Sequence, residues 1–233
     1  MRHRFFCVLA VLVLTTLTCF SQQREITQFS LIAGPSYLAT PSLNLAQRGF
    51  NLDLATNYRP WLSMGFDFSA FTGGTTLMPQ YLNAATQAKL GALPKPLFMS
   101  VAGGVPFTTS TYTYQMGPQL NYRHFRKVTL FVRPALGLLH AKFQTHPEKL
   151  SSPYATPVIM GLLNGKLSSA DTSVFYGFGG GATWEIHPNF GLRATVDLAR
   201  YNFFAQTLTG PRNSVRFSVT TKFGFGRNIM SKY

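Results

Sequence analysis

Apolar and polar residues alternate one by one along several stretches of the chain. Phe50, Leu52 and Leu54, for example, are separated by Asn51 and Asp53. Side chains two residues apart lie on the same face of a β-strand, so each such stretch has one apolar and one polar face. The alternation recurs in residues 50–58, 62–69, 112–122, 192–199 and 214–225, and less cleanly in residues 27–39, 128–142 and 173–186. The pattern predicts eight strands.

The lengths of the connections predict how these strands are arranged. Tight turns join the second strand to the third, the fourth to the fifth and the sixth to the seventh. The longer connections are residues 40–47, 72–111, 143–172 and 204–212. Because short turns at one end alternate with long loops at the other, we expect an all-β, eight-stranded antiparallel up-and-down transmembrane β-barrel. The middle of the longest loop, residues 81–90, is expected to form a short surface helix.

The direction of the polar face distinguishes a membrane barrel from a soluble one. A soluble barrel carries many charges outside, whereas here the polar positions are mostly Asn, Gln, Ser, Thr and Gly. That composition favours a narrow wet lumen, with the apolar face toward lipid. Tyr58, Trp61, Tyr122 and Trp184 stand beside the short turns and predict an aromatic girdle at the periplasmic side. A soluble barrel with its apolar face inward is the alternative.

The first 21 residues have the features of a secretory signal peptide. A basic start precedes a short apolar run, and Ser21 supplies a small residue at the expected cleavage site. The mature chain, residues 22–233, is then expected to be one barrel domain. The alternatives are a lipoprotein with its lipid on Cys19 and a retained anchor, although the apolar run is shorter than the ~20 residues that a spanning helix needs. Both cysteines, Cys7 and Cys19, lie in this segment, so no disulfide is expected in the barrel.

Composition excludes three other classes of protein. Hydrophobic residues make up 45% of the chain, which argues against intrinsic disorder. The chain has 20 Gly and 14 Pro but only 12% charged residues, which argues against a helical bundle. A polytopic helical membrane protein would need several long apolar stretches, and the sequence has one short one.

Charged residues on the polar faces of the predicted strands are the candidate site. A charge that faces lipid costs about 2–4 kcal/mol at the bilayer midplane, so these side chains should point into the lumen. They are Asp53, Asp67, Arg133, Glu185, Arg193, Asp197, Arg216 and Lys222. Since buried charges are tolerated when they are paired, we expect the four acidic and four basic groups to pair and to close the lumen. A gated conductance is the alternative.

Glycines on the same inward phase are expected to make room for the long arginine side chains. They are Gly177, Gly179, Gly181 and Gly224. Residues 177–182 also resemble a glycine-rich nucleotide loop. They lie inside a strand pattern with no helix after them, so this interpretation is rejected.

No pattern of catalytic, cofactor-binding or metal-binding residues emerges. The histidines are scattered without metal-ligand spacing, and no Ser–His–carboxylate set can be assigned. We therefore expect no enzymatic activity, no cofactor and no metal. The net charge of +14 favours phosphate-rich lipopolysaccharide as a partner. Nucleic acid is not expected, because the cations are dispersed rather than gathered with stacking aromatic residues.

As a pattern, most of the expected mature chain resembles small outer-membrane β-barrel proteins of the OmpA/OmpX type, and the resemblance is specific from about residue 173 to residue 226. VFYGFGGGATWE (174–185) and FGLRATVD (190–197) resemble the penultimate hairpin of these proteins, and SVRFSVTTKFGF (214–225) resembles the closing strand. The resemblance implies a monomeric eight-stranded barrel inserted by the outer-membrane assembly machinery. The sequence differs in two ways: no peptidoglycan-binding domain follows the barrel, and the chain runs eight residues past Phe225.

Together these observations predict a non-enzymatic protein of the outer membrane of a Gram-negative-type bacterium. Its expected contribution is to envelope integrity or surface interaction, with the lumen closed by internal ion pairs. Two alternatives are a small ion or solute pore and an adhesin that acts through the long loops.

Overall fold

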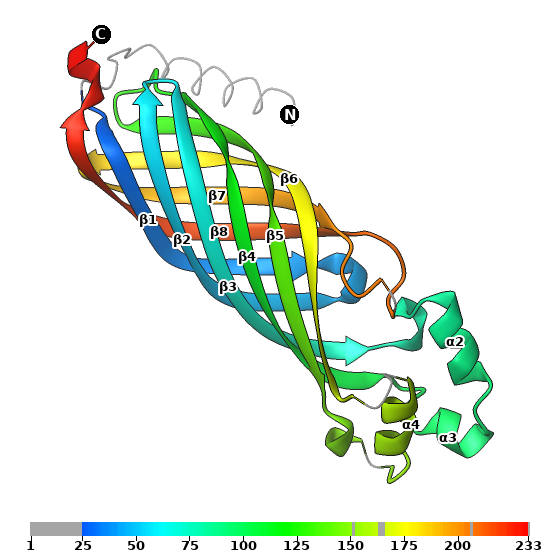
Figure 1. Cartoon of the computed structure of the whole chain (residues 1–233). Coiled ribbons are helices and arrows are strands. Elements are labelled where there is room, and N and C mark those ends of the chain that lie inside the picture. The colour runs from blue at the N-terminus through cyan, green and yellow to red at the C-terminus, as the bar shows by residue number, and fades with distance from the viewer. Residues whose placement is uncertain (1–24, 151, 163–165, 206, 233) are drawn as a thin grey trace, which may run out of the picture.

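A closed antiparallel barrel of eight strands forms the body of the protein (Figure 1). The computed structural model describes residues 25–150, 152–162, 166–205 and 207–232. Each strand pairs with its neighbour along the chain, and β1 pairs with β8 to close the ring. The strands are β1 (Thr27–Thr40), β2 (Leu45–Arg59), β3 (Leu62–Leu77), β4 (Val105–Tyr122), β5 (Val128–Thr145), β6 (Ser168–His187), β7 (Phe190–Tyr201) and β8 (Arg212–Asn228). The predicted eight-stranded up-and-down barrel is confirmed, whereas the expected signal peptide lies outside the described residues.

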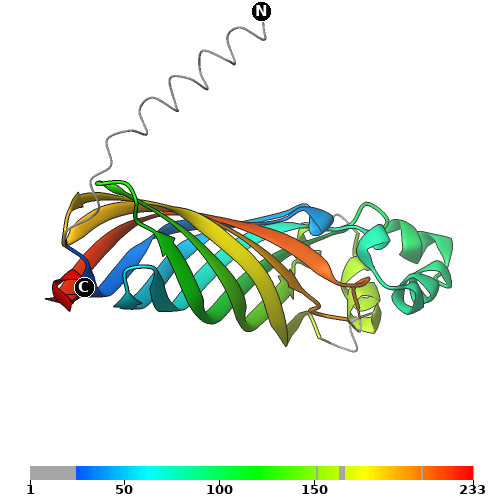
Figure 2. The ribbon, with the colours of Figure 1, turned by 90° about the horizontal axis from the view of Figure 1, so that it is seen from above.

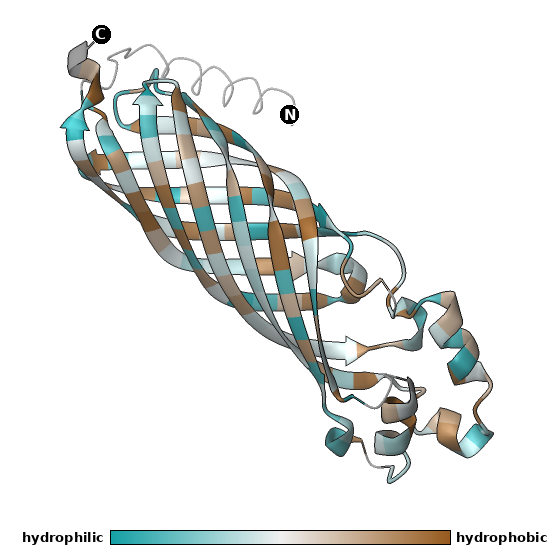
Figure 3. Cartoon of the chain, in the orientation of Figure 1, coloured by the Kyte–Doolittle hydropathy of each residue, from teal (hydrophilic) through white to brown (hydrophobic). Residues whose placement is uncertain are grey.

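The outer surface of the barrel is apolar along the middle of the strands. Large side chains such as Leu54, Phe66 and Val219 are exposed on it, and Leu136 is 62% exposed. Their neighbours along the strands point inward and are mostly small or polar, which gives the ribbons in Figure 3 their alternating colours. Such a continuous apolar exterior would be unstable in water, and it matches the lipid-facing band of a membrane barrel.

The predicted aromatic girdle follows the turn end of this surface. Tyr58, Trp61, Tyr122 and Trp184 are all exposed beside the short turns. Aromatic side chains with a polar atom favour the boundary between lipid and water. The girdle therefore marks one edge of the apolar band.

Toward the loop end, the strands continue past the apolar band. There the apolar side chains lie on the inner face of the strands instead of the outer face. In β4, Tyr112 and Tyr114 are exposed on the outer face, but nearer the loop Val105 and Phe107 are buried and Thr108 is exposed. There the barrel resembles a soluble one, with apolar side chains inside. The predicted bounds of the two long loops were wrong: residues 72–77, 105–111, 143–145 and 168–172 lie in strands. The change of phase explains residues 105–111 and 143–145, whereas residues 72–77 and 168–172 have no apolar alternation.

Short helices cover the loop end of the barrel. The expected helix at residues 81–90 is present as η3 (Pro79–Tyr81) and α2 (Ala84–Gly91), and it is joined by α3 (Lys95–Met99) and by η4 (Pro147–Lys149) and α4 (Ala155–Leu162) of the next long loop. In Figures 1 and 2, α2, α3 and α4 gather beyond the strand ends. No helix among the described residues is long and apolar enough to cross a membrane.

The two chain ends of the described barrel meet at the turn end. Ile229 lies in η5 (Ile229–Lys232), and its N–H donates to the carbonyl of Ile26 at 2.9 Å. Asn228 Oδ1 accepts from the Ile26 N–H at 3.0 Å, and both isoleucine side chains are buried. The residues after Phe225 thus fold against the start of β1. A last short helix, η2 (Pro41–Leu43), makes the connection from β1 to β2 at the opposite end.

Leu136→Arg tests which face meets lipid. We expect the substitution to destabilise the barrel in phosphatidylcholine vesicles by about 2–4 kcal/mol, because it places a charge in the apolar band. Urea unfolding followed by tryptophan fluorescence measures the loss. Gln144→Arg is the matched control on the same strand, since Gln144 is exposed beyond that band. Equal stability of the two variants would show that water surrounds Leu136.

Candidate functional site

All eight predicted charged residues lie on strands with their side chains buried in the barrel. Asp53 comes from β2, Asp67 from β3, Arg133 from β5, Glu185 from β6, Arg193 and Asp197 from β7, and Arg216 and Lys222 from β8. They form two groups. We call Asp53, Asp67, Arg133, Arg193, Asp197 and Arg216 the ion network, and we call Glu185 and Lys222, with Arg123, the turn-end cluster.

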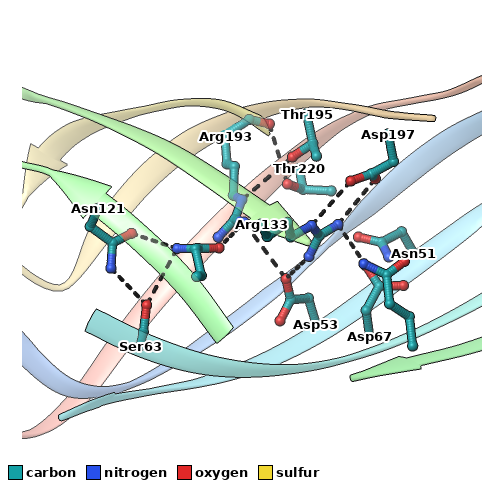
Figure 4. A network of polar contacts seen from close by, with 12 residues as sticks. Asn51, Asp53, Ser63, Asp67, Asn121, Arg133, Arg193, Thr195, Asp197 and Thr220 are labelled. Atoms are coloured by element: carbon teal, nitrogen blue, oxygen red, sulfur yellow. Dashed lines mark hydrogen bonds and ion pairs between the residues drawn. The ribbon is translucent and has the colours of Figure 1, made fainter. Parts of the chain in front are cut away.

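Arg133 is the hub of the ion network (Figure 4). Its Nη1 lies 3.0 Å from Asp53 Oδ2, and its Nη2 lies 3.1 Å from both Asp67 Oδ2 and Asp197 Oδ2. Its Nε donates to Asp197 Oδ1 at 3.1 Å. Asp53 and Asp67 are directly opposite each other in the β2–β3 register, an arrangement that is destabilising for like charges. A guanidinium that bonds to both carboxylates offsets this repulsion.

Arg216 binds two of the same carboxylates. Its Nη1 lies 2.7 Å from Asp67 Oδ1, and its Nη2 lies 2.7 Å from Asp197 Oδ2. Ser69 Oγ and Gln115 Oε1 accept two further hydrogen bonds from this guanidinium, at 2.7 and 3.3 Å. The buried charge is therefore both paired and hydrogen-bonded, which is the condition for tolerating it in a low-dielectric interior.

Arg193 makes a different set of contacts. Its Nη2 lies 3.8 Å from Asp53 Oδ2 and donates to Gln119 Oε1 at 2.5 Å. Its guanidinium carbon stands 3.7 Å from the centre of the Phe131 ring, in cation–π geometry. Phe131 was not anticipated in this role, because the alternation of residues 128–142 is irregular.

The turn-end cluster includes Arg123, a residue that the period-two pattern of the sequence does not predict. Lys222 Nζ lies 2.6 Å from Glu185 Oε1, and Arg123 Nη1 lies 4.0 Å from the same oxygen. Arg123 belongs to the β4–β5 turn, where no alternation indicates direction, yet its side chain turns inward and donates to the Pro60 carbonyl at 2.8 Å. Burial lowers the pKa of Arg123 to about 10, and the Glu185 carboxylate opposes that shift, so the group stays charged at neutral pH. The acidic and basic groups therefore do not simply pair four against four.

The inward glycines make room for other side chains than expected. A Cβ on Gly179 would collide with the Asp197 carboxylate, and one on Gly181 would meet the Phe131 ring at 2.9 Å. A Cβ on Gly224 would collide with Thr27, and one on Gly177 would collide with the backbone of Leu198. No arginine atom is among the nearest neighbours of these positions, so the expectation that the four glycines accommodate arginines directly was wrong. Only Gly179 and Gly181 lie against a carboxylate and a ring that in turn contact arginine.

An apolar cluster fills the barrel on the loop side of the ion network. We call it the apolar cap. Its members are Leu43, Leu45, Leu82, Leu90, Val101, Val105, Phe107, Leu139, Ala141, Phe143, Ala155, Val158, Ile159, Phe175, Tyr201, Phe203, Phe204 and Leu208. Barrel strands, both helical loops and the β7–β8 connection all contribute to it.

Phe204 anchors the β7–β8 connection in the apolar cap. Its backbone is left-handed, with φ of 51°, which is unusual for a bulky residue. Asp171 Oδ2 accepts its N–H at 2.5 Å, and the N–H groups of Thr207 and Leu208 both donate to its carbonyl at 2.8 Å. Its ring packs edge-on against Phe143, with ring centroids 4.8 Å apart. These bonds and this packing hold the strained residue in the barrel mouth.

Little space is left around these side chains. A cavity bordered by Gln115, Leu139, Asp197, Tyr201 and Arg216 lies between the ion network and the apolar cap, with a volume of about 20 Å³. A cavity within the cap, beside Phe107, Phe203 and Phe204, has the same volume. Each has room for about one water molecule.

The described residues offer no metal centre. No group of three or more His, Cys, Asp or Glu residues stands close enough to hold a metal ion within the part of the chain that the structure describes.

Removal of the hub guanidinium tests the ion network. We expect Arg133→Ala to destabilise the barrel by about 3–5 kcal/mol, because it leaves carboxylates buried without their partner. Arg126→Ala, at an exposed position in the β4–β5 turn, should change the free energy of unfolding by less than about 0.5 kcal/mol. Urea titration in vesicles measures both. Similar small losses for the two variants would contradict the structural role of the network.

Comparison with known proteins places the fold. No protein-family model and no curated protein sequence matches the chain. Among solved structures, Neisserial surface protein A matches with a TM-score of 0.52 and 15% identity, over 85% of this chain and 98% of the other. Ail, the attachment invasion locus protein of Yersinia pestis, matches with a TM-score of 0.47 and 16% identity, over 86% of this chain and 100% of the other. The likeness to Neisserial surface protein A confirms the fold expected from the OmpA/OmpX resemblance, that of a small outer-membrane β-barrel.

Proposed function

We propose that this chain is a non-enzymatic, monomeric outer-membrane barrel whose lumen is closed. It contributes to the integrity of the envelope and presents a helical surface at its loop end. The observation that carries this proposal is the filling of the barrel by two layers in series, the ion network and the apolar cap. The outer-membrane assembly machinery would insert the chain, as the resemblance of its closing strand implies.

The two layers close the lumen by different physical means. Ions that enter from the turn end meet the fixed guanidinium groups of Arg133 and Arg216. These groups are already paired with the carboxylates of Asp67 and Asp197, so a moving ion gains little by replacing them. Beyond these groups most of the interior is apolar, and the buried polar pair Gln47–Thr111 is already hydrogen-bonded, so an ion would lose its hydration with little compensation. A solute that crossed the barrel would have to displace both layers.

Lipopolysaccharide is the partner that the cations at the loop-side edge of the apolar band favour. These cations are Arg48 on β2, Lys142 on β5 and Arg200 on β7; all three are exposed, and we call them the rim cations. The acidic residues of the described strands point inward or, in the case of Asp171, bond to the β7–β8 connection. Cations at this level can bind the phosphates of lipopolysaccharide in the outer leaflet.

Surface interaction through the loop-end helices is the second candidate function. Met99 is 70% exposed and Tyr154 is 54% exposed at this end, on loops that pack against the apolar cap. Exposed apolar side chains on an ordered support are typical of contact surfaces. A loop deletion that preserves folding and abolishes binding to a surface would support this role.

Single-channel recording tests the closed lumen. The wild-type chain should show no steady current, and neither should Arg193→Ala/Arg216→Ala or Phe203→Ala/Phe204→Ala, because each leaves one layer in place. The combined quadruple variant should conduct. Heat-dependent gel mobility identifies the variants that fold. A steady wild-type current, or silence of a folded quadruple variant, would contradict the proposal that these two layers close the barrel.

Exchange of the rim cations tests the lipopolysaccharide contact. Arg48→Glu/Lys142→Glu/Arg200→Glu should lower the lipopolysaccharide that co-purifies with the barrel by roughly tenfold, since each reversal replaces attraction by repulsion worth about 1 kcal/mol or less. Arg59→Glu/Arg126→Glu/Arg227→Glu is the matched control, because these exposed cations lie at the turn end. Phosphate analysis of the purified protein measures the difference. Equal amounts in both variants would contradict a specific rim contact.

A further inference from the structure

The helices at the loop end border an open groove that the barrel does not need for closure. Among the described residues it is bordered by Lys89 of α2, by Leu93 and Leu97 on and before α3, and by Pro157, Val158 and Gly161 of α4. Its volume is about 360 Å³, far larger than the cavities in the lumen. That volume falls within the range of about 300–1,000 Å³ that is typical of small-molecule sites. In Figures 1 and 2 the three helices lie beyond the strands, away from the barrel wall.

The walls of the groove are a packed unit. Asn83 caps α2, with its Oδ1 accepting the Thr86 N–H at 2.8 Å. Leu90 of α2 and Ile159 of α4 are buried in the apolar cap beneath the groove. A site built on helices whose inner faces are already packed needs little reorganisation when a ligand binds.

The lining combines apolar surface with a single positive charge. Leu93, Leu97 and Val158 supply the apolar part, and Lys89 is its only charged member among the described residues. The sequence from residue 72 to residue 111 contains no acidic residue, so nothing in this loop neutralises Lys89 within its own segment. The complementary ligand has one negative group attached to an apolar chain.

We propose that this groove binds a free long-chain fatty acid. The carboxylate pairs with the Lys89 ammonium group, and the hydrocarbon chain lies against Leu93, Leu97 and Val158. Burial of the chain supplies most of the affinity, since each buried methylene contributes about 0.8 kcal/mol. The exposed ion pair contributes less and sets the orientation of the ligand.

One glycine of the lining allows the groove to be filled without disturbing its walls, and a second glycine, outside the lining, supplies the control. A Cβ at Gly161 meets nothing within 4 Å, so Gly161→Leu should occupy the groove without a backbone clash. A Cβ at Gly91 also meets nothing within 4 Å, but Gly91 does not border the groove. Both glycines are helical, and leucine favours a helix over glycine in both places, so Gly91→Leu is the matched control.

Photo-crosslinking of the full-length mature chain in lipid nanodiscs tests the proposal. A fatty acid with a diazirine on its chain should label peptides of α2, α3 and α4. Gly161→Leu should reduce this labelling by roughly tenfold and Gly91→Leu should leave it unchanged, as expected for the loss of a few buried methylenes. Lys89→Glu should weaken labelling about fivefold, whereas Lys95→Glu, outside the lining, should not.

The competing occupants give different results. Labelling confined to the outer face of the barrel, or equal labelling of the two leucine variants, would overturn the site. A diazirine phospholipid that labels the same helices as strongly as the fatty acid would show that bilayer chains reach the groove, and that would overturn the free fatty acid as occupant. A dimer in sedimentation experiments that Gly161→Leu disrupts would assign the groove to a second copy instead.

Discussion

The rest of the structure depends on the burial of charge inside a closed ring of strands. Arg133 on β5 bonds to carboxylates from β2, β3 and β7, so one side chain links strands that are distant along the sheet. Because a charge facing lipid is costly, these groups can only point inward, and their direction fixes the register of every strand that carries one. A slip by one residue would turn both the carboxylates and the lipid-facing side chains to the wrong environment.

The long strands pass through two surroundings, and their side chains reflect this. Along β5, Leu136 and Leu138 face outward within the apolar band, whereas Leu139 and Phe143, nearer the loop, are buried in the apolar cap. Within the lipid, the apolar side chains of the barrel lie outside. Beyond the lipid they lie inside, as in a soluble protein. The change of phase places an apolar closure directly above an ionic one, and it gives the loop-end helices a packed base.

Alternation alone was sufficient to predict the eight strands and the inward direction of residues such as Asp53 and Arg216, since period-two patterning reports directly on two-faced strands. The alternation did not predict structure where a strand leaves the apolar band or where the chain turns. Residues 105–111 were assigned to a loop because their apolar phase is reversed there. Arg123 was missed because a turn has no period, and the partners of each carboxylate depend on the shear of the closed barrel, which a single sequence does not specify.

The mobility of the mature chain in SDS gels, with and without boiling, shows whether the protein from an outer-membrane fraction is a closed membrane barrel. A closed membrane barrel with paired charges inside resists unfolding by detergent, so the unboiled protein should migrate differently from the boiled one. Equal mobility, together with recovery of the protein in the soluble periplasm, would contradict the membrane barrel and would reverse the assignment of inside and outside on every strand.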